Sequence, residues 1–319
     1  MEEGRDPRVP PRTPMTAEHS PTPSPPSSTL GVAAVAVIVL ALYALVAVGV
    51  DSPLWRGLVR GEPVGLETRL SDEERDKAAH LDAAFARMGY RLEHVAQGGV
   101  VPPLFLPAVP GDLNDLPATE DKKHIFLRLM LPLVLVVNEE IIEDRRRLEA
   151  MAAGRAPRDD GWLAELAARY GAEGAAPGQL LRRVDVVPPS LALAQAAEES
   201  GWGTSRFVRE ANNLFGHTGA DVAPENDPDG QRMAAFSNLH EAVRAYVHNL
   251  NTHGAYETLR RARAAARARG AFPDGHTLAG ALINYSERRG AYVDTIRALI
   301  RTNRLLRFDH ARLGRGVSS

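Results

Sequence analysis

The sequence predicts a mostly helical α+β protein in which one apolar helix precedes a larger folded part. Residues 30–50 are apolar and uncharged, and several later segments repeat apolar residues at helical spacing. Residues 216–235 are rich in Gly, Pro, Asp and Asn between short apolar pieces, which is typical of a turn-rich β-hairpin. Helices around a small hairpin form a domain with a cleft between two lobes.

The composition excludes several kinds of site. The chain has 319 residues, enough for one or two domains with a sizeable core, and its net charge of -2 does not suit a nucleic-acid-binding polycation. It has no Cys, which excludes disulfides, thiolate zinc sites and a Cys nucleophile. The sequence after His240 lacks the second His of a zinc-protease motif, and no Gly-rich phosphate loop is present. We therefore expect neither a metal nor a cofactor.

The first fifty residues divide into a tail and an apolar segment. Residues 1–29 are rich in Pro, Ser and Thr and are expected to be disordered. As a helix, residues 30–50 would span roughly 30 Å, the thickness of a bilayer core, so we expect a single transmembrane anchor. The alternative is a signal peptide cleaved near residues 47–49, but the segment exceeds the usual ~7–15 apolar residues and lacks a compact basic start. Arginines flank both sides, so charge does not decide the orientation.

Residues 51–120 carry weaker signals, and we expect a juxtamembrane segment and a linker. Ser71 is a plausible N-cap for a helix reaching Met88, and the Gly- and Pro-rich residues 98–117 suggest an extended tether. A buried helix is predicted for residues 125–137, with Pro132 inside it and a charged continuation over 139–149. At ~13 residues the apolar run is too short to cross a bilayer. An amphipathic helix is predicted at 162–170.

Residues 188–199 predict a helix that carries two carboxylates at its end. Pro and Ser begin it, and Gly201 and Gly203 stop it. The residues before Glu198 and Glu199 are almost all Leu or Ala, so the helix is expected to be buried. Burial raises the pKa of a carboxyl group toward the value that a general acid needs. Periodicity does not decide which Glu faces a cleft, nor does it exclude that both lie at a partly exposed helix end.

The same stretch resembles a known family. Ala-Gln-Ala-Ala-Glu-Glu-Ser-Gly-Trp-Gly at 194–203 and Ala-Asn-Asn-Leu-Phe-Gly at 211–216 are similar to the peptidoglycan β-N-acetylglucosaminidases, the glucosaminidase domains of glycoside hydrolase family 73. Residues 138–141 and 180–190 fit the Bax-like branch best. The resemblance implies a lysozyme-like fold for residues 121–312, followed by a short tail at 313–319. It places the catalytic acid directly before Ser-Gly-Trp-Gly, at Glu199.

The resemblance also implies a substrate and a location. We expect hydrolysis of the β-1,4 bond between N-acetylglucosamine and N-acetylmuramic acid in peptidoglycan. The enzyme would be a single-pass protein of the inner (cytoplasmic) membrane, with its C-terminal domain on the periplasmic or wall side. Two alternatives are a lytic transglycosylase on the same fold and a non-enzymatic wall-binding or scaffold protein.

A second catalytic group is expected on the hairpin, because glycoside hydrolysis usually uses two. We select Glu225, although any of the hairpin acids, which are Asp221, Glu225, Asp227 and Asp229, could be a solvated turn residue. The acetamido group of the substrate could also replace this carboxylate. By resemblance, Tyr285 lines the cleft and Tyr292 lies in the core, with simple packing as the alternative for Tyr285.

Four further residues are expected to contact the substrate, on resemblance and on the fit of flat aromatic faces to sugar rings. They are Trp202, Asn213, Phe215 and Tyr256. Trp202 and Phe215 could equally be core residues, and Asn213 could bridge the hairpin.

The remaining sequence predicts helices that complete the domain. Asn238 is expected to cap a helix with Glu241 at its third position. A buried stripe follows at Leu239, Ala242, Val243, Tyr246, Val247 and Leu250. Further helices are predicted at 255–269, 277–285 and 292–306. The five arginines between 260 and 269 are expected to form a solvated face, or alternatively to attract the anionic wall.

Overall fold

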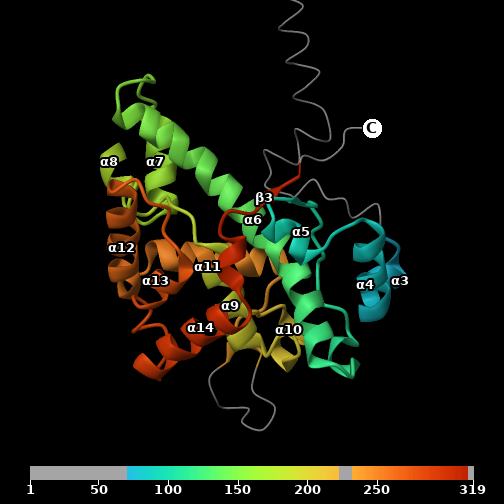
Figure 1. Cartoon of the computed structure of the whole chain (residues 1–319). Coiled ribbons are helices and arrows are strands. Elements are labelled where there is room, and N and C mark those ends of the chain that lie inside the picture. Colours follow the sequence, from blue (N-terminus) through green and yellow to red (C-terminus); the bar gives the residue numbers. More distant parts are fainter. Residues whose placement is uncertain (1–69, 223–231, 315–319) are drawn as a thin grey trace, which may run out of the picture. The chain divides into compact units, whose positions relative to one another are not determined.

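The computed structural model describes residues 70–222 and 232–314, and it is mostly helical, as predicted (Figure 1). The chain divides into two units, Met1–Glu62 and Pro63–Ser319, and the described residues all belong to the second. The expected tail and the apolar segment at 30–50 lie outside the described residues. Within the described part, no helix is long and apolar enough to cross a membrane.

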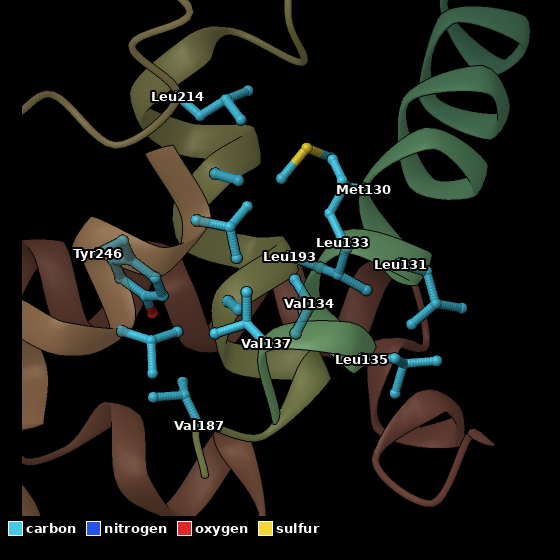
Figure 2. Packing of buried hydrophobic residues seen from close by; sticks show 14 of the residues in the cluster. Met130, Leu131, Leu133, Val134, Leu135, Val137, Val187, Leu193, Leu214 and Tyr246 are labelled. Carbon is cyan, nitrogen blue, oxygen red and sulfur yellow. The ribbon is translucent and has the colours of Figure 1, made fainter. Parts of the chain in front are cut away.

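Helix α6 (Thr119–Ala152) runs through the middle of the second unit and supplies much of its core. Its apolar half is buried with Pro132 inside, as the sequence predicts. Figure 2 shows Met130 and Val137 of α6 facing Leu193 of α9 (Pro189–Ser200) and Tyr246 of α11 (Leu239–Thr252). These side chains exclude water from one side of α9, so α6 supports that helix.

Asn138 explains why a polar residue is buried in α6. Its Nδ2 donates to the carbonyl oxygen of Val187 at 2.8 Å, and its Oδ1 accepts from the Val187 amide at 3.1 Å. The buried amide is therefore satisfied. The paired bonds fix the segment that leads into α9.

The residues before α6 are folded onto the domain. Ser71 caps helix α3 (Asp72–Asp76), as predicted, and it forms a capping box with Glu74. The helix expected to reach Met88 is interrupted at the extended Lys77, and α4 (Ala78–Arg87) follows. Helix α5 (Leu92–Ala96), strand β1 (Val100–Val101) and the 3-10 helix η2 (Leu113–Asp115) complete this part.

The expected tether at 98–117 is wrong. Val101, Leu104, Phe105 and Leu106 are buried, and β1 pairs in parallel with β3 (Arg312–Leu313) in the register Val100↔Arg312. Gly and Pro mark the turns of this segment, but the apolar residues between them pack into the core. The folded unit therefore begins well before residue 121.

The structure contains the two ends of the predicted hairpin, at residues 218–222 and 232–234. Strand β2 (Thr218–Val222) meets the returning chain at the bridge Thr218↔Met233. The Gly219 amide donates to the Arg232 carbonyl at 2.9 Å. A Cβ on Gly219 would lie 2.6 Å from the Ala234 Cα, so only glycine permits this approach. The predicted closing strand at 234–236 is displaced to Met233, and residues 223–231 lie outside the described part.

The helices after the hairpin follow the predicted order. Helix α11 is capped by Asn238, whose Oδ1 accepts from the Glu241 amide at 2.9 Å, and its predicted stripe is entirely buried. The helix predicted at 277–285 is shorter than expected, because turns replace it after α13. The other elements are α7 (Asp160–Arg169), α8 (Pro177–Leu180), α10 (Arg206–Ala211), η3 (Gly254–Tyr256), α12 (Glu257–Ala268), α13 (Gly275–Ala279), α14 (Gly290–Thr302) and η4 (Leu305–Phe308).

The arginine-rich helix α12 does not present only a solvated face. Arg260 and Arg263 are buried. Arg263 Nη1 donates to the carbonyl oxygens of Asp185 at 3.1 Å and Val186 at 2.9 Å. The loop before α9 offers carbonyl groups and the buried Asp185 carboxylate, and α12 supplies the donors. This partner is distant in sequence, so the local pattern could not reveal it.

Candidate active site

Helix α9 ends where the sequence predicts. Gly201 adopts the left-handed conformation at φ 58°, and its amide donates to the Ala197 carbonyl. Gly203 has φ 81°, and a Cβ there would lie 2.9 Å from Phe126 of α6. Gly201 is therefore required by its left-handed backbone. Gly203 is required by its positive φ and because a Cβ would have no room. They stop the helix so that its last turn carries Glu198 and Glu199.

The two carboxylates have different surroundings. Glu198 accepts a hydrogen bond from Arg288 Nη2 at 2.6 Å, and this pair is partly exposed. Glu199 is half-buried, and desolvation raises its pKa above the ordinary value. A hydrogen bond from Tyr292 opposes that rise, the charge of Glu198 adds to it, and Arg288 weakly opposes it. The surroundings of Glu199 thus favour its protonated form.

Gly216 lies directly against Glu199. Its φ is +66°, and a Cβ at this position would come within 3.2 Å of Glu199 Oε2. The loop that follows α10 therefore covers the carboxyl group with backbone alone. This contact gives a physical reason for glycine at the end of Asn-Asn-Leu-Phe-Gly.

Tyrosines surround Glu199. Among the described tyrosines, the charge of Glu199 acts on four, which are Tyr246, Tyr256, Tyr285 and Tyr292. The Tyr285 and Tyr292 rings stack with centroids 5.3 Å apart, and Tyr256 lies 5.8 Å from Tyr285. Desolvation raises the pKa of each of these phenols, so all remain neutral hydrogen-bonding groups.

A chain of buried hydrogen bonds leads to Glu199. Tyr246 Oη donates to Gln195 Oε1 at 2.7 Å, and Gln195 Nε2 donates to Tyr292 Oη at 3.0 Å. Because the Tyr292 oxygen accepts from Gln195, its own proton is available for Glu199, with which it forms a hydrogen bond. The sequence placed Tyr292 in the core, where it is, but did not reveal this contact. For Gln195, the only signal in the sequence was its position one helical turn before Glu199.

The predicted aromatic residues lie in different places. Tyr285 is half-buried beside Tyr292, and its hydroxyl donates to the Phe215 carbonyl at 3.1 Å. Tyr256 retains slight exposure at the edge of the cluster. Phe215 is buried and stacks on Tyr246 with centroids 3.9 Å apart. Trp202 packs its ring edge-on against Phe126 of α6, centroids 5.8 Å apart, and remains partly exposed.

Asn213 holds the loop over the site. It is buried, its Nδ2 donates to the carbonyl oxygens of His217 at 2.7 Å and Ala234 at 2.9 Å, and its Oδ1 accepts from the His217 amide at 3.0 Å. Its polar atoms are engaged within the chain. Direct substrate contact by Asn213 stays a prediction, whereas its role in bridging the hairpin is visible.

The predicted second carboxylate, Glu225, lies outside the described residues, as do Asp227 and Asp229. Asp221 is exposed, and its Oδ2 accepts from the Ala235 amide at 3.0 Å within the hairpin. Among the described residues, His, Asp and Glu side chains form no cluster able to hold a metal ion. Glu199 does not line the cavity of about 590 Å³ between α6 and α11.

Comparisons with known proteins agree with the motif around Glu199. The family model described as mannosyl-glycoprotein endo-beta-N-acetylglucosaminidase, named Glucosaminidase, matches residues 178–305. Protein bax of Escherichia coli (strain K12) is 33% identical over 208 residues, which cover 61% of this chain and 74% of that protein. The chain belongs to the glucosaminidase family. It is therefore a glycoside hydrolase, as the resemblance implied.

One solved structure extends the comparison of this glucosaminidase. The catalytic domain of the autolysin Auto from Listeria monocytogenes has 16% sequence identity and a TM-score of 0.35. The match covers 62% of this chain and 93% of that one. A TM-score at this level does not establish a shared fold.

Proposed function

We propose that this glucosaminidase is a membrane-anchored peptidoglycan hydrolase that cleaves the β-1,4 bond between N-acetylglucosamine and N-acetylmuramic acid. The observation that carries the proposal is the setting of Glu199. A half-buried carboxyl group ends a buried helix among four tyrosines, and burial raises its pKa. Such a group suits the proton donor that a departing sugar oxygen requires.

Glu199 acts as the general acid. Desolvation keeps its proton in place before the reaction, because the ionised form is poorly solvated. Proton transfer to the glycosidic oxygen then leaves a carboxylate. Tyr292 donates a hydrogen bond to that carboxylate, and Gln195 leaves the Tyr292 proton free to do so. The same hydroxyl thereby stabilises the group that forms during bond cleavage.

The neighbouring tyrosines bind and orient the sugar. The Tyr285 hydroxyl uses its proton on the Phe215 carbonyl, which leaves its oxygen to accept from a sugar hydroxyl. Tyr256 lies beside it, with slight exposure at the edge of the cluster. Trp202 provides an aromatic face beyond the end of α9. The attacking water is activated by Glu225 of the hairpin, or the substrate acetamido group takes that role.

The remaining parts follow from the sequence. The lysozyme-like fold comprises residues 121–312 together with the preceding segment that packs on them. Residues 30–50 anchor the protein in the inner membrane, and the catalytic unit faces the wall. This location brings the enzyme to the glycan strands.

Digestion of purified cell-wall sacculi tests the reaction. We expect the full-length protein to release products with reducing N-acetylglucosamine ends, and Glu199→Gln to lose this activity while still folding. Glu198→Gln is the matched control, because it removes the Arg288 ion pair and keeps the acid.

The products distinguish the alternatives. Anhydromuramyl ends would assign a lytic transglycosylase, and binding to sacculi without cleavage would assign a scaffold. Equal product release by wild type and Glu199→Gln would remove Glu199 from the mechanism.

A further inference from the structure

A second pocket, of about 670 Å³, lies between the end of α6, the turn after α8 and the end of α12. Three of its lining residues are Arg145, Arg182 and Arg267, and one is Glu149. Its other walls are small or apolar: Gly178, Leu181, Ala264, Ala268, Gly270, Ala271 and Phe272. We call it the arginine pocket.

Positive charge exceeds negative charge in and beneath this pocket. Arg263 and Asp185 lie under its arginines, both buried. The guanidinium groups are those of Arg145, Arg182, Arg263 and Arg267, and the carboxylates are those of Glu149 and Asp185. Four positive charges against two negative charges leave two positive charges in excess. Burial lowers the pKa of Arg263 to about 10, and the charges of Arg267 and Arg145 add to that effect while Asp185 opposes it. Burial is the main cause of this shift, and Asp185 opposes it more than any one neighbouring arginine adds to it.

The fold holds these arginines in place and leaves donors unused. Arg267 donates Nε to Asp185 Oδ2 at 2.7 Å and Nη2 to Oδ1, and Nη1 has no hydrogen-bond partner among the described residues. Arg145 Nη1 donates to the carbonyl oxygens of Leu181 at 2.7 Å and Val184 at 3.0 Å, while Nη2 is equally unused within the described part.

Arg182 is the most available of the three. Its side chain is exposed, and it forms no hydrogen bond or ion pair within residues 70–222 and 232–314. Its backbone is fixed nonetheless, because Arg263 Nη2 donates to the Arg182 carbonyl at 3.3 Å. At its rim the pocket thus has an exposed guanidinium group that has no partner among the described residues.

We propose that the arginine pocket binds an oxyanion, a carboxylate or a phosphate group, through Arg182 and the unused N–H groups of Arg145 and Arg267. Guanidinium groups bind such anions through paired, charge-assisted hydrogen bonds. Bound anion offsets the excess positive charge, and the small residues leave room for the rest of the ligand.

The pocket is separate from Glu199. Asp185 lies just before α9, whose 12 residues rise roughly 18 Å to the catalytic end. The anion held there is therefore not part of the bond being cleaved. If the proposed function holds, the carboxylates of the wall peptides are one source. Anion binding itself does not depend on that function.

Calorimetric titration of the full-length protein at low ionic strength tests the site, with sodium phosphate and sodium glutarate as probes. We expect saturable binding at one site, weakened about tenfold or more by Arg182→Gln because a charge-assisted bond is lost. Arg146→Gln is the matched control. Arg146 is adjacent to Arg145 in sequence but exposed, and it forms an ion pair with Glu143 at 3.7 Å.

Tighter binding of glutarate would assign the site to carboxylates, and tighter binding of phosphate to phosphates. Absence of saturation with both probes, or equal weakening by Arg182→Gln and Arg146→Gln, would overturn the proposal in favour of unspecific attraction. Because Arg182 is exposed and has no partner in the described part of the chain, its variant should melt at the wild-type temperature, which separates lost binding from unfolding. A protein that binds the anion but does not cut sacculi would refute only the proposed function.

Discussion

The hydroxyl of Tyr292 is the most direct test of how Glu199 holds its proton. The change Tyr292→Phe removes one oxygen atom from a side chain that is fully buried. Two hydrogen bonds disappear with it. Tyr292 no longer donates to Glu199, and Gln195 Nε2 loses its acceptor, the Tyr292 oxygen 3.0 Å away. The ring and its stacking on Tyr285 remain.

The two losses have different consequences. A hydrogen bond to a charged group contributes about 1.5–3 kcal/mol, and here it stabilises the ionised carboxylate. Its loss raises the pKa of Glu199 further above the ordinary value. The unpaired Gln195 amide lowers the free energy of unfolding by about 1–3 kcal/mol, the cost of a buried donor without a partner.

The pH dependence of kcat/KM on sacculi measures the first effect. A general acid works in its protonated form, so activity falls as the pH rises through the pKa of Glu199. We expect the alkaline limb of the Tyr292→Phe profile to move to higher pH. Tyr285→Phe is the control, because its hydroxyl bonds the Phe215 carbonyl instead, and its limb should not move.

An alkaline limb that stays in place or moves to lower pH in Tyr292→Phe would refute this account of Glu199. A direct ¹³C titration of the glutamate carboxyl groups gives the same answer without activity. Urea unfolding reports the stability loss separately.

Three further changes test the surroundings of the site. Glu199→Gln should raise the free energy of unfolding at neutral pH, because a pKa raised by folding means that the ionised form of Glu199 destabilises the fold. In thermal melts this gain in stability should vanish below pH 4.5, the ordinary pKa of the group. A gain that persists in acid would contradict this explanation. Gly216→Ala should lower the free energy of unfolding by about 1–2 kcal/mol through its left-handed backbone and reduce kcat by crowding Glu199 Oε2; a wild-type kcat would exclude the contact. Asp185→Asn should cost about 3–5 kcal/mol in urea unfolding, because Arg263 is left buried without its carboxylate; a loss below 1 kcal/mol would show that the backbone carbonyls suffice.

Local patterns predicted the elements that position Glu199. Pro189 and Gly201 mark the ends of α9, and the spacing from Leu239 to Leu250 gives the buried face of α11. These signals are local, because a cap or a stripe needs only residues within a few turns. The resemblance then chose Glu199 over Glu198, and the Arg288 ion pair of Glu198 gives a physical reason for that difference.

Contacts between distant segments were not predictable. Arg263 was expected on a solvated face because a run of arginines usually forms one, yet the Asp185 loop, 78 residues earlier, supplies acceptors. Phe105 was placed in a tether because Gly and Pro surround it, and the structure buries it. The hydrogen bond of Tyr292 to Glu199 joins two helices whose separation along the chain hides it.

The parallel pairing of β1 with β3 has a consequence for biosynthesis. Val100 pairs with Arg312, which lies 212 positions later in the sequence. The amide of Leu313 also donates a hydrogen bond to the Glu139 side chain. Contacts this distant form late, since the intervening chain must be ordered first. A nascent chain therefore cannot complete this strand pair until Arg312 and Leu313 have left the ribosome, and loss of these two residues would leave one edge of β1 open to other strands.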